Sequence, residues 1–345
     1  CGVTNNGPDV ADLYKVRVNP SNPFQYEWNG AWRDMTVRDE TIHFAGSDET
    51  TTIQVRETHL GPIINDNKWN NETKNLTGLN NKDPMALRWT GLDTSTLAQA
   101  VMSIDKAQNW EEFRSALQYW DVPSQNFVYA DINGNIGYQM PGRIPIRAGN
   151  DTGLVPAPGW TSEFEWEGFI PFEDLPSILN PERGYIVTAN QAVVPPDYYD
   201  KLAQKLGQGR NYVFSREWDY GYRAQRITEL LNATQKHTIA TFQSIQGDIK
   251  SLSAEELMPY LANLHFDDAD LANARDWLLQ WDYQFNAESP QAVLYSNFWA
   301  TLLDNLFNDQ VHNVKLDGEA IHAYGTDADM RAVYLLMQEP DNAWW

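Results

Sequence analysis

Residues 1–14 read CGVTNNGPDVADLY and residues 184–191 read GYIVTANQ, and these two stretches are the most informative of the chain. Each carries an asparagine beside small residues, Asn5 in the first and Asn190 in the second, with acids nearby. These residue types equip a polar site that holds both an oxyanion and a cation. We therefore expect the chemistry of the protein to lie around them.

Length and composition predict a folded globular body. The chain has 345 residues, enough for one large domain or two ordinary ones, and 42% hydrophobic residues can build a sizeable core. The sequence opens inside the first motif, and its first methionine is Met35. We expect it to be a piece of a longer protein.

The charge balance argues against several partners. The chain has 47 acidic and 25 basic residues. Its net charge of -22 repels nucleic acid and anionic lipid surfaces. Most acids are scattered in pairs, such as Glu111 with Glu112, which indicates a solvated surface. Cys1 is the single cysteine, so an internal disulfide is excluded. No apolar run reaches the roughly 18 residues that a membrane span needs, and no secretory signal is visible in this stretch.

Two turn signals predict β-hairpins in the first half. Residues 24–35, FQYEWNGAWRDM, alternate aromatic and polar positions around Asn29–Gly30, a pair that favours a two-residue turn. Residues 126–140, NFVYADINGNIGYQM, repeat the pattern around Asn133–Gly134 and predict two strands with a tight turn.

Helical spacing appears between the hairpins and dominates after Pro195. Residues 96–120 have helical periodicity, with Asn109 placed to cap a helix and Glu112 three residues later. Further amphipathic helices are predicted over residues 223–232, 253–264, 269–282 and 290–308. We predict an α+β fold in one domain, 1–345, with 1–195 mainly strands and hairpins and 196–345 mainly helical.

Several motifs fail when they are tested against their chemistry. The segment DINGN from Asp131 looks like a calcium loop, but the required glycine is Ile136 and the required bidentate acid is Gly142, so it reads as a hairpin turn. The six histidines are far apart and form no two-histidine zinc pattern, and no GxSxG elbow is present. Fourteen tryptophans leave a sugar-binding cleft open as an alternative, although tryptophans spread this way are usually core.

Cys1 offers a second reading of the N-terminus. An N-terminal cysteine can act as a nucleophile with its own α-amino group as base, because that group titrates near neutrality. However, a truncated sequence must begin with some residue, and nothing in the chain shows that this end is made by maturation. An arbitrary fragment end is the favoured interpretation.

The order of several motifs resembles the penicillin acylase family. The family pattern WGxTN, an acid-rich DVxDLY and a later TAN segment is matched by CGVTN, DVADLY and VTAN. Further matches run along nearly the whole chain: RETHLGPIIND, NWEEFRSALQ, QNFVYADINGNIGY, VPAPGWTSEFEWEGFIPFEDLP, YRAQRI and the closing AWW. The resemblance implies an N-terminal-nucleophile amidohydrolase with an αββα sandwich, stacked antiparallel sheets flanked by helices, incomplete at both ends in this chain.

The resemblance also implies which residues support catalysis. Cys1 stands where the family has the tryptophan of its WG pair, so the chain resembles a fragment of the large β subunit without its nucleophilic serine. Asn5 matches the residue whose backbone N–H points into the oxyanion hole, and Asn190 matches the side-chain amide donor. Arg223, in YRAQRI, matches the arginine that orients this neighbourhood, with a surface partner for nearby acids as the alternative.

A calcium site is the remaining implication of the resemblance. Asp9, the Ala11 carbonyl and Asp12 match three ligands found in some members, and hard oxygen ligands suit calcium. Thr152 lies where a backbone carbonyl is expected, and Asp200 is the nearest candidate for another carboxylate. The alternative is that the two acids of the first loop merely cap turns. No organic cofactor is expected.

We therefore expect hydrolysis of linear amides through an acyl-enzyme. Family members act on penicillins, cephalosporin side chains, acyl-homoserine lactones and lipopeptides, so the substrate is an N-acyl compound of open identity. Trp28, Trp32 and Trp166 are candidates to face a pocket. The resemblance implies a small α subunit cut from the same precursor and a periplasmic or secreted location. Two alternatives stay open: a glycan-active or glycan-binding protein, and a family member that has lost catalysis.

Overall fold

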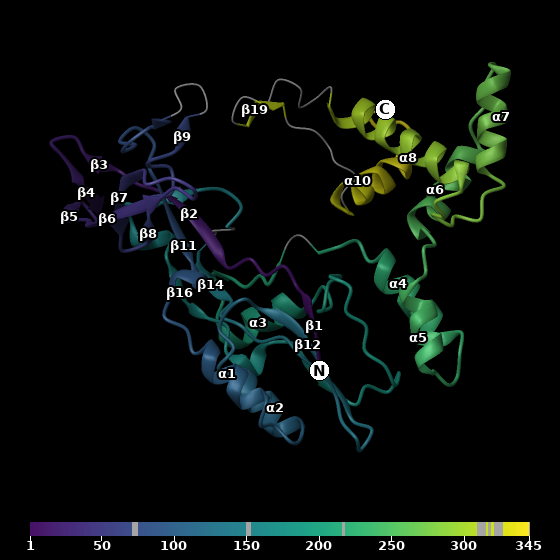
Figure 1. Cartoon of the computed structure of the whole chain (residues 1–345), viewed down its shortest axis with the longest axis horizontal. Helices are drawn as coiled ribbons and strands as arrows, with labels where there is room; N and C mark the ends of the chain where they lie inside the picture. Colours follow the sequence, from purple (N-terminus) through teal and green to yellow (C-terminus); the bar gives the residue numbers. More distant parts are fainter. Residues whose placement is uncertain are drawn as a thin grey trace. The chain divides into compact units, whose positions relative to one another are not determined.

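The computed structural model describes residues 1–70, 75–149, 153–215, 218–308, 315–316, 319–320 and 327–344. These residues form two compact units. The strand-rich unit comprises Cys1–Ile186 and Val193–Arg216, and the helical unit comprises Val187–Ala192 and Glu217–Trp345. Helices and mainly antiparallel sheets occur together (Figure 1), so the chain is α+β as predicted.

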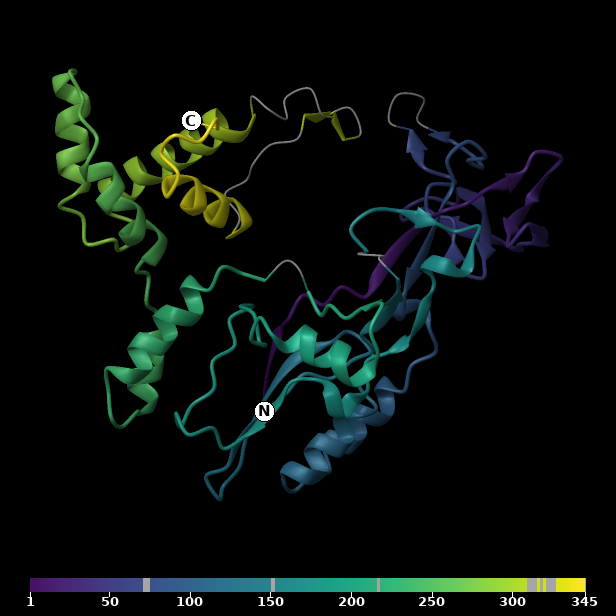
Figure 2. The same cartoon turned by 180° about the vertical axis from the view of Figure 1, so that it is seen from behind.

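Small sheets build the strand-rich unit. The sheet of four strands has the order β1 (Gly2–Asn5), β12 (Gln125–Ala130), β13 (Ile136–Gln139) and β17 (Ser177–Leu179). Two three-stranded sheets have the orders β11 (Met85–Trp89), β2 (Ala11–Lys15), β15 (Ala157–Pro158), and β16 (Trp166–Phe169), β14 (Pro145–Ala148), β18 (Arg210–Asn211). Seen from the front and from behind, β1 runs beside β12 (Figure 1, Figure 2).

The remaining strands of this unit belong to hairpins. One sheet consists of β3 (Val18–Asn19), β4 (Asn22–Trp28) and β5 (Ala31–Asp34), and another of β6 (Thr36–His43), β7 (Thr50–Thr58) and β8 (Gly61–Pro62). A two-stranded sheet pairs β9 (Trp69–Asn70) with β10 (Asn75–Leu76). Pairing within these sheets is antiparallel, which suits short connections.

The first predicted hairpin is confirmed, and the second differs at its turn. Asn29 and Gly30 have φ values of +46° and +76°, and β4 pairs with β5 directly across them, as a two-residue turn requires. In the second hairpin Ala130 pairs with Ile136, so residues 131–135 form a five-residue loop. Its turn is built by the Asp131 carboxylate, which accepts hydrogen bonds from the backbone N–H groups of residues 133 and 135.

Residues 96–120 form two helices with a break between them. They are α1 (Leu97–Ile104) and α2 (Trp110–Leu117), which lie side by side (Figure 1). The predicted cap is present, because the Asn109 side chain accepts a hydrogen bond from the backbone N–H of Glu112. Glu112 reaches back to the N–H of Gln108, one residue further than in the usual capping box.

Helices dominate the second half, as predicted. The helical unit contains α4 (Tyr222–Asn232), α5 (Ile239–Gln246), α6 (Leu252–Ala262), α7 (Ala269–Leu278), α8 (Pro290–Leu303) and α10 (Asp327–Met337). It also contains the short strands β19 (Lys315–Leu316) and β20 (Glu319–Ala320). In the predicted segment 290–308 the α-helix ends at Leu303, and a π-helix follows over Asp304–Asn308. Helix α5 and α3 (Tyr198–Leu206) of the strand-rich unit were not predicted, because their short apolar patterns are weak.

Each unit has its own core. In the strand-rich unit α2 packs on β12 through a cluster of aromatic and aliphatic side chains: Trp110, Phe113, Leu117, Phe127 and Tyr129. Gly137 faces the Trp110 ring so closely that a Cβ there would lie 2.4 Å from it. The core of the helical unit joins α6, α7 and α8 through Ala254, Leu257, Met258, Leu261, Leu278, Trp281, Ala292 and Tyr295.

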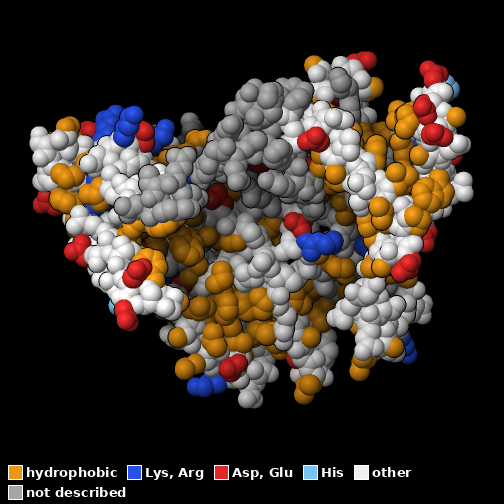
Figure 3. Space-filling model, turned by 45° about the horizontal axis from the view of Figure 1, so that its top comes forward, with side chains coloured by type: hydrophobic (Ala, Val, Ile, Leu, Met, Phe, Trp, Pro, Cys, Tyr) orange, Lys and Arg blue, Asp and Glu red, His pale blue; other side chains and the backbone are white. Residues whose placement is uncertain are grey.

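The surface agrees with the predicted charge distribution. On the face drawn in Figure 3, acidic side chains are scattered over both units among apolar and neutral groups. None of the helices in the described part of the chain is both long and apolar enough to cross a membrane.

Candidate active site

The loop that carries Asn190 is held in one conformation by its own neighbours. Asn190 has a φ of +66°, in the left-handed region that asparagine tolerates better than most residues. The Gln191 side chain spans the turn, accepting from the N–H of Ala189 and donating to the carbonyl of Val187. The Asn190 carbonyl accepts from the N–H of Asp219 at 3.0 Å, which ties the loop to the segment before α4.

Arg223 fixes the orientation of the Asn190 side chain. Its Nη2 donates to Asn190 Oδ1 at 2.7 Å. A guanidinium has donors only, so this contact identifies the amide oxygen and directs the two N–H groups of Asn190 Nδ2 elsewhere. Arg223 also forms an ion pair with Asp219 four residues earlier. The structure therefore brings two of the three predicted catalytic residues into direct contact.

The position of Arg223 in its helix is not explained by helix stability. It lies in the first turn of α4, where the helix dipole disfavours a cation. The side chain is 60% exposed, so burial does not explain it either. Its contact with Asp219 fits the interpretation as a surface partner for nearby acids. Its contact with the Asn190 amide fits the interpretation as an orienting residue.

A cleft lined by charged and apolar side chains, Arg223 among them, lies within the helical unit. It has a volume of about 530 Å³ and runs between α4 and the segments around α5 and α6. Its walls include Arg226 and Asp248, whose carboxylate receives two hydrogen bonds from that guanidinium, at 2.9 and 2.7 Å. These bonds hold the pKa of Asp248 below its ordinary value of 3.8. Burial, helped by a hydrogen bond to Glu256, raises the pKa of Tyr222 on the same wall.

Asn5 lies in the strand-rich unit, at the end of β1. Its carbonyl accepts a hydrogen bond from Asn126 Nδ2 at 3.1 Å, and Asn126 is fully buried. The next residue, Asn6, is also buried and donates to Ser124 Oγ at 3.1 Å. The backbone around Asn5 is therefore anchored on β12 and on the residue Ser124 just before it. Asn5 and Asn190 belong to different units.

Asp9 and Asp12, the two carboxylates predicted to bind calcium, are contacted by an arginine. Arg147 donates to both carboxylate oxygens of Asp12, at 2.8 and 3.1 Å, and to Asp9 Oδ1 at 3.0 Å. The Trp166 indole N–H also donates to Asp12. The oxygens that would bind calcium thus already accept hydrogen bonds, and in this arrangement they do not fit a divalent ion beside the guanidinium. Calcium at these residues stays a prediction.

The other predicted calcium ligands are the Ala11 carbonyl, Asp200 and Thr152. Ala11 begins β2 and is exposed, and Asp200 is exposed in the first turn of α3, where the helix dipole favours an acid. Thr152 lies outside the described residues. Across the described ranges, no three side chains of His, Cys, Asp or Glu are placed to hold a metal ion.

A second polar cluster escaped the sequence reasoning. His59 Nδ1 lies 2.9 Å from the Tyr26 hydroxyl, and His59 Nε2 lies 3.0 Å from the Glu165 carboxylate, which also accepts from the Trp28 indole N–H. The cluster borders a cavity of about 150 Å³ that Trp166 also lines. Two of the three tryptophans predicted to face a pocket are therefore near one, whereas Trp32 is exposed. The partners are up to 137 residues apart, so no local pattern could have revealed the cluster.

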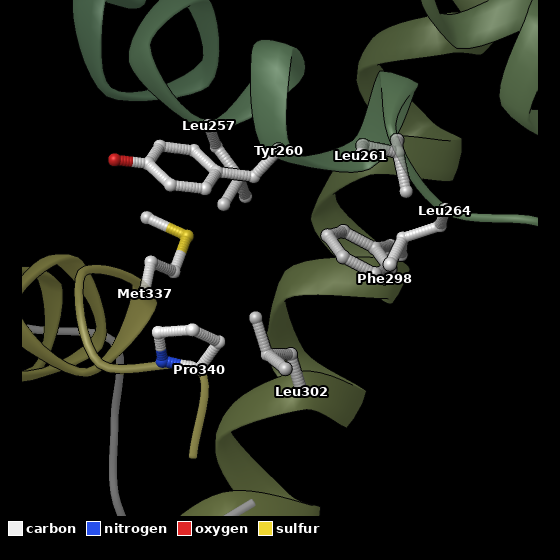
Figure 4. Close-up of a pocket in the computed structure, with 8 residues that line it drawn as sticks. All are labelled: Leu257, Tyr260, Leu261, Leu264, Phe298, Leu302, Met337 and Pro340. Carbon is white, nitrogen blue, oxygen red and sulfur yellow. The ribbon is translucent and has the colours of Figure 1, made fainter. Parts of the chain in front are cut away.

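An apolar pocket lies inside the helical unit (Figure 4). It has a volume of about 280 Å³, and the described residues that line it are Leu257, Tyr260, Leu261, Leu264, Phe298, Leu302, Met337 and Pro340. The side chains converge from α6, α8 and the end of α10. Tyr260 supplies the single hydroxyl of this set, so these residues provide shape for an apolar group and no acid–base pair.

Comparisons with known proteins all find acylases and amidases. The family model for penicillin amidase matches residues 2–345. Acyl-homoserine lactone acylase QuiP from Pseudomonas fluorescens is 28% identical over 354 residues, covering 98% of this chain and 41% of that protein. Penicillin G acylase from Escherichia coli is 28% identical over 347 residues, covering 100% of this chain and 36% of that protein. The chain thus spans about two fifths of the length of these relatives.

A solved structure supports the same assignment at the level of the fold. Thermostable penicillin G acylase from Alcaligenes faecalis superposes with a TM-score of 0.73 at 23% identity, covering 99% of this chain and 62% of that one. This likeness confirms the N-terminal-nucleophile hydrolase fold that the motifs predicted. Because the family model extends over almost every residue, the chain belongs to the penicillin amidase family.

Proposed function

We propose that this protein hydrolyses linear amides of N-acyl compounds through an acyl-enzyme formed on an N-terminal serine that lies outside residues 1–345. Family membership supports the reaction class. The observation that carries the proposal is the 2.7 Å hydrogen bond from Arg223 to Asn190 Oδ1, because it turns the donor end of the amide away from the guanidinium. An oriented N–H donor is what a developing oxyanion requires.

In the proposed reaction the serine hydroxyl attacks the amide carbonyl carbon, and its proton passes to the serine's own α-amino group. The carbonyl oxygen becomes an oxyanion, which accepts a hydrogen bond from Asn190 Nδ2. The α-amino group then protonates the leaving amine, and the acyl group stays on the serine as an ester. Water then attacks the ester carbonyl carbon and gives a proton to the α-amino group, which passes it to the serine oxygen as the ester C–O bond breaks and the carboxylic acid leaves. Arg223 is a positioning residue, since it acts through Asn190.

The names of the relatives support the substrate class. They include acyl-homoserine lactone acylases and penicillin acylases, whose shared substrate feature is an acyl group on an amine nitrogen. One relative, from a Pseudomonas species, is named a proenzyme, which supports a precursor cut into a small α subunit and a large β subunit. We propose the same maturation here, with a periplasmic or secreted location.

The decisive experiment measures turnover of two chromogenic amides, a phenylacetyl amide and a long-chain fatty acyl amide, by the matured full-length protein. Asn190→Ala should lower kcat by a factor of about 100 to 1000, as expected for one oxyanion donor. Arg223→Ala should lower kcat while KM changes little, and Arg223→Lys should recover only part, because lysine lacks the planar fork. Gln225→Ala on the same helix, which removes a contact with Glu229, is the matched control.

Two results would overturn the proposal. The first is no acid or amine released from either amide, or from a broader panel of N-acyl compounds, after mass spectrometry has verified the matured N-terminal serine. The second is an Asn190→Ala variant whose kcat stays within twofold of the wild type.

A further inference from the structure

Arg147 is a fully buried arginine whose described partners are mainly the two acids near the start of the chain. Its side chain is 0% exposed, and those of Asp12 and Asp9 are 3% and 23% exposed. Four donor contacts reach them: two to the Asp12 carboxylate, one to the Asp9 carboxylate and one, at 3.3 Å, to the Asp9 carbonyl. A buried charge is tolerated only when it is paired and hydrogen-bonded in this way.

Two sheets meet at this ion pair. Arg147 lies on β14 and is the cross-strand neighbour of Trp166 on β16, and both side chains donate to Asp12 on β2, which belongs to the other sheet. Asp12 is therefore held by a guanidinium and an indole from one pair of strands. The planar fork of arginine matches the two oxygens of a carboxylate, so the contact fixes direction as well as charge.

The surroundings leave little room beside the pair. Gly153 has a φ of +70°, and a Cβ built on it would lie 2.8 Å from both Arg147 Nε and Asp12 Oδ1. The backbone at Gly153 thus covers the contact closely. Calcium needs six to eight oxygen ligands at about 2.3 to 2.6 Å, and a second cation at this distance from a guanidinium would be repelled.

We propose that Arg147 is the built-in cation of the Asp9–Asp12 segment, and that this protein holds the segment without calcium. The guanidinium supplies the positive charge and the directional contacts that a bound metal ion would otherwise give. The pair then joins the sheets of β2 and β14 whatever the calcium concentration. Removing the guanidinium leaves both carboxylates without the cation that they share, so a variant without it gains an affinity for calcium.

The experiment is thermal unfolding of the full-length protein in EDTA and in millimolar calcium chloride, with magnesium chloride as the ionic control. Wild-type Tm should be the same in all three, and the purified protein should contain far less than one calcium per chain by inductively coupled plasma mass spectrometry. Arg147→Met should lower Tm in EDTA by about 6 to 15 °C, since one partner of a buried pair is left uncompensated. Calcium, but not magnesium, should restore part of this loss.

Matched variants separate this effect from general damage. Arg143→Met removes a nearby guanidinium that pairs with Asp121 at 3.0 Å, and its Tm should not respond to calcium. Arg147→Lys keeps the charge without the fork, so its Tm should lie between wild type and Arg147→Met, with a weaker calcium response. This variant decides the question if Arg147→Met does not fold.

Three outcomes would contradict the inference. One is a wild-type Tm that rises with calcium and loses that rise in Asp12→Asn. Another is stoichiometric calcium in the purified wild-type protein. The third is an Arg147→Met or Arg147→Lys protein whose Tm in EDTA equals that of the wild type. None of these readouts depends on amidase activity, so the test stands apart from the proposed reaction.

Discussion

The two units of this protein place their charged groups differently. In the strand-rich unit, Arg56 and Arg147 are 0% exposed and each holds a nearly buried carboxylate. In the helical unit, the pair of Arg226 with Asp248 keeps 23% and 17% of its side chains exposed, and the core is formed by apolar and aromatic side chains. The difference follows from architecture. Small sheets bury short strands from distant parts of the chain together with their charged side chains. Amphipathic helices bury one apolar face and leave the opposite, charged face exposed to solvent.

Arg56 shows how completely a buried arginine is satisfied in the strand-rich unit. Its Nε and Nη2 donate to the two oxygens of Asp66, at 2.8 and 2.9 Å. Its remaining N–H groups donate to the Pro23 carbonyl, the Asn81 side chain and the Asn80 carbonyl. All five guanidinium donors are used. The lesson is that buried charge in this unit specifies which loops meet, because each donor selects one partner.

The largest effect is expected from breaking the Arg56 pair. Arg56→Met should lower the free energy of unfolding by about 3 to 5 kcal/mol, because Asp66 stays buried without its partner. Chemical denaturation followed by circular dichroism measures it. The double variant Arg56→Met with Asp66→Leu should recover much of the loss, since it removes both charges. A single variant within about 1 kcal/mol of wild type would contradict the contrast between the units.

A core truncation gives the corresponding test in the helical unit. Leu278 on α7 is 3% exposed within the core cluster, so Leu278→Ala should cost about 2 to 5 kcal/mol through lost burial and a residual cavity. Leu271 on the same helix is 55% exposed and is the matched control. Leu271→Ala should change the free energy of unfolding by less than about 0.5 kcal/mol in the same denaturation experiment. Equal losses from both variants would show that α7 is not anchored by this core.

Acid should selectively weaken the partly exposed pair of the helical unit. The hydrogen bonds from Arg226 lower the pKa of Asp248 in the folded protein below the ordinary 3.8. The pair therefore contributes stability that is present above pH 3.8 and is lost as the pH falls through the lowered pKa. The difference in free energy of unfolding between wild type and Asp248→Asn should be constant from pH 7 to 5 and shrink below pH 3.8. Urea titrations along this pH series test it, and a difference that grows on acidification would reverse the sign.

The smallest effect is expected for an exposed pair in the strand-rich unit. Lys201 and Asp197 on and before α3 lie 2.7 Å apart, but their side chains are 66% and 60% exposed. Lys201→Ala should change the free energy of unfolding by at most about 0.5 kcal/mol, and less in 0.5 M salt. Because this pair shares a unit with Arg56, the comparison separates burial from location. A loss of 2 kcal/mol or more in the denaturation experiment would mean that burial is not the deciding variable.

Local signals in the sequence predicted local structure well. Asn29 and Gly30 favour positive φ, so the turn forms wherever its strands lie, and Asn109 caps α2 through a contact three residues away. The turn at 131–135 was predicted too tight, because the Asp131 side chain replaces the backbone pattern of a two-residue turn. The predicted pairing of Asn190 with Arg223 came from motif resemblance alone, because 33 residues separate them.

By itself the sequence determined the α+β composition, the hairpin and helix signals, the negative surface and the order of motifs that marks the penicillin amidase family. Only the tertiary structure decided that Arg147 meets Asp12 across 135 residues, and that Arg223 turns the Asn190 amide. Helical periodicity and turn preference depend on neighbours within a few residues, so they can be read along the chain. The partner of a buried charge depends on which strands become adjacent, and that adjacency exists only in the folded protein.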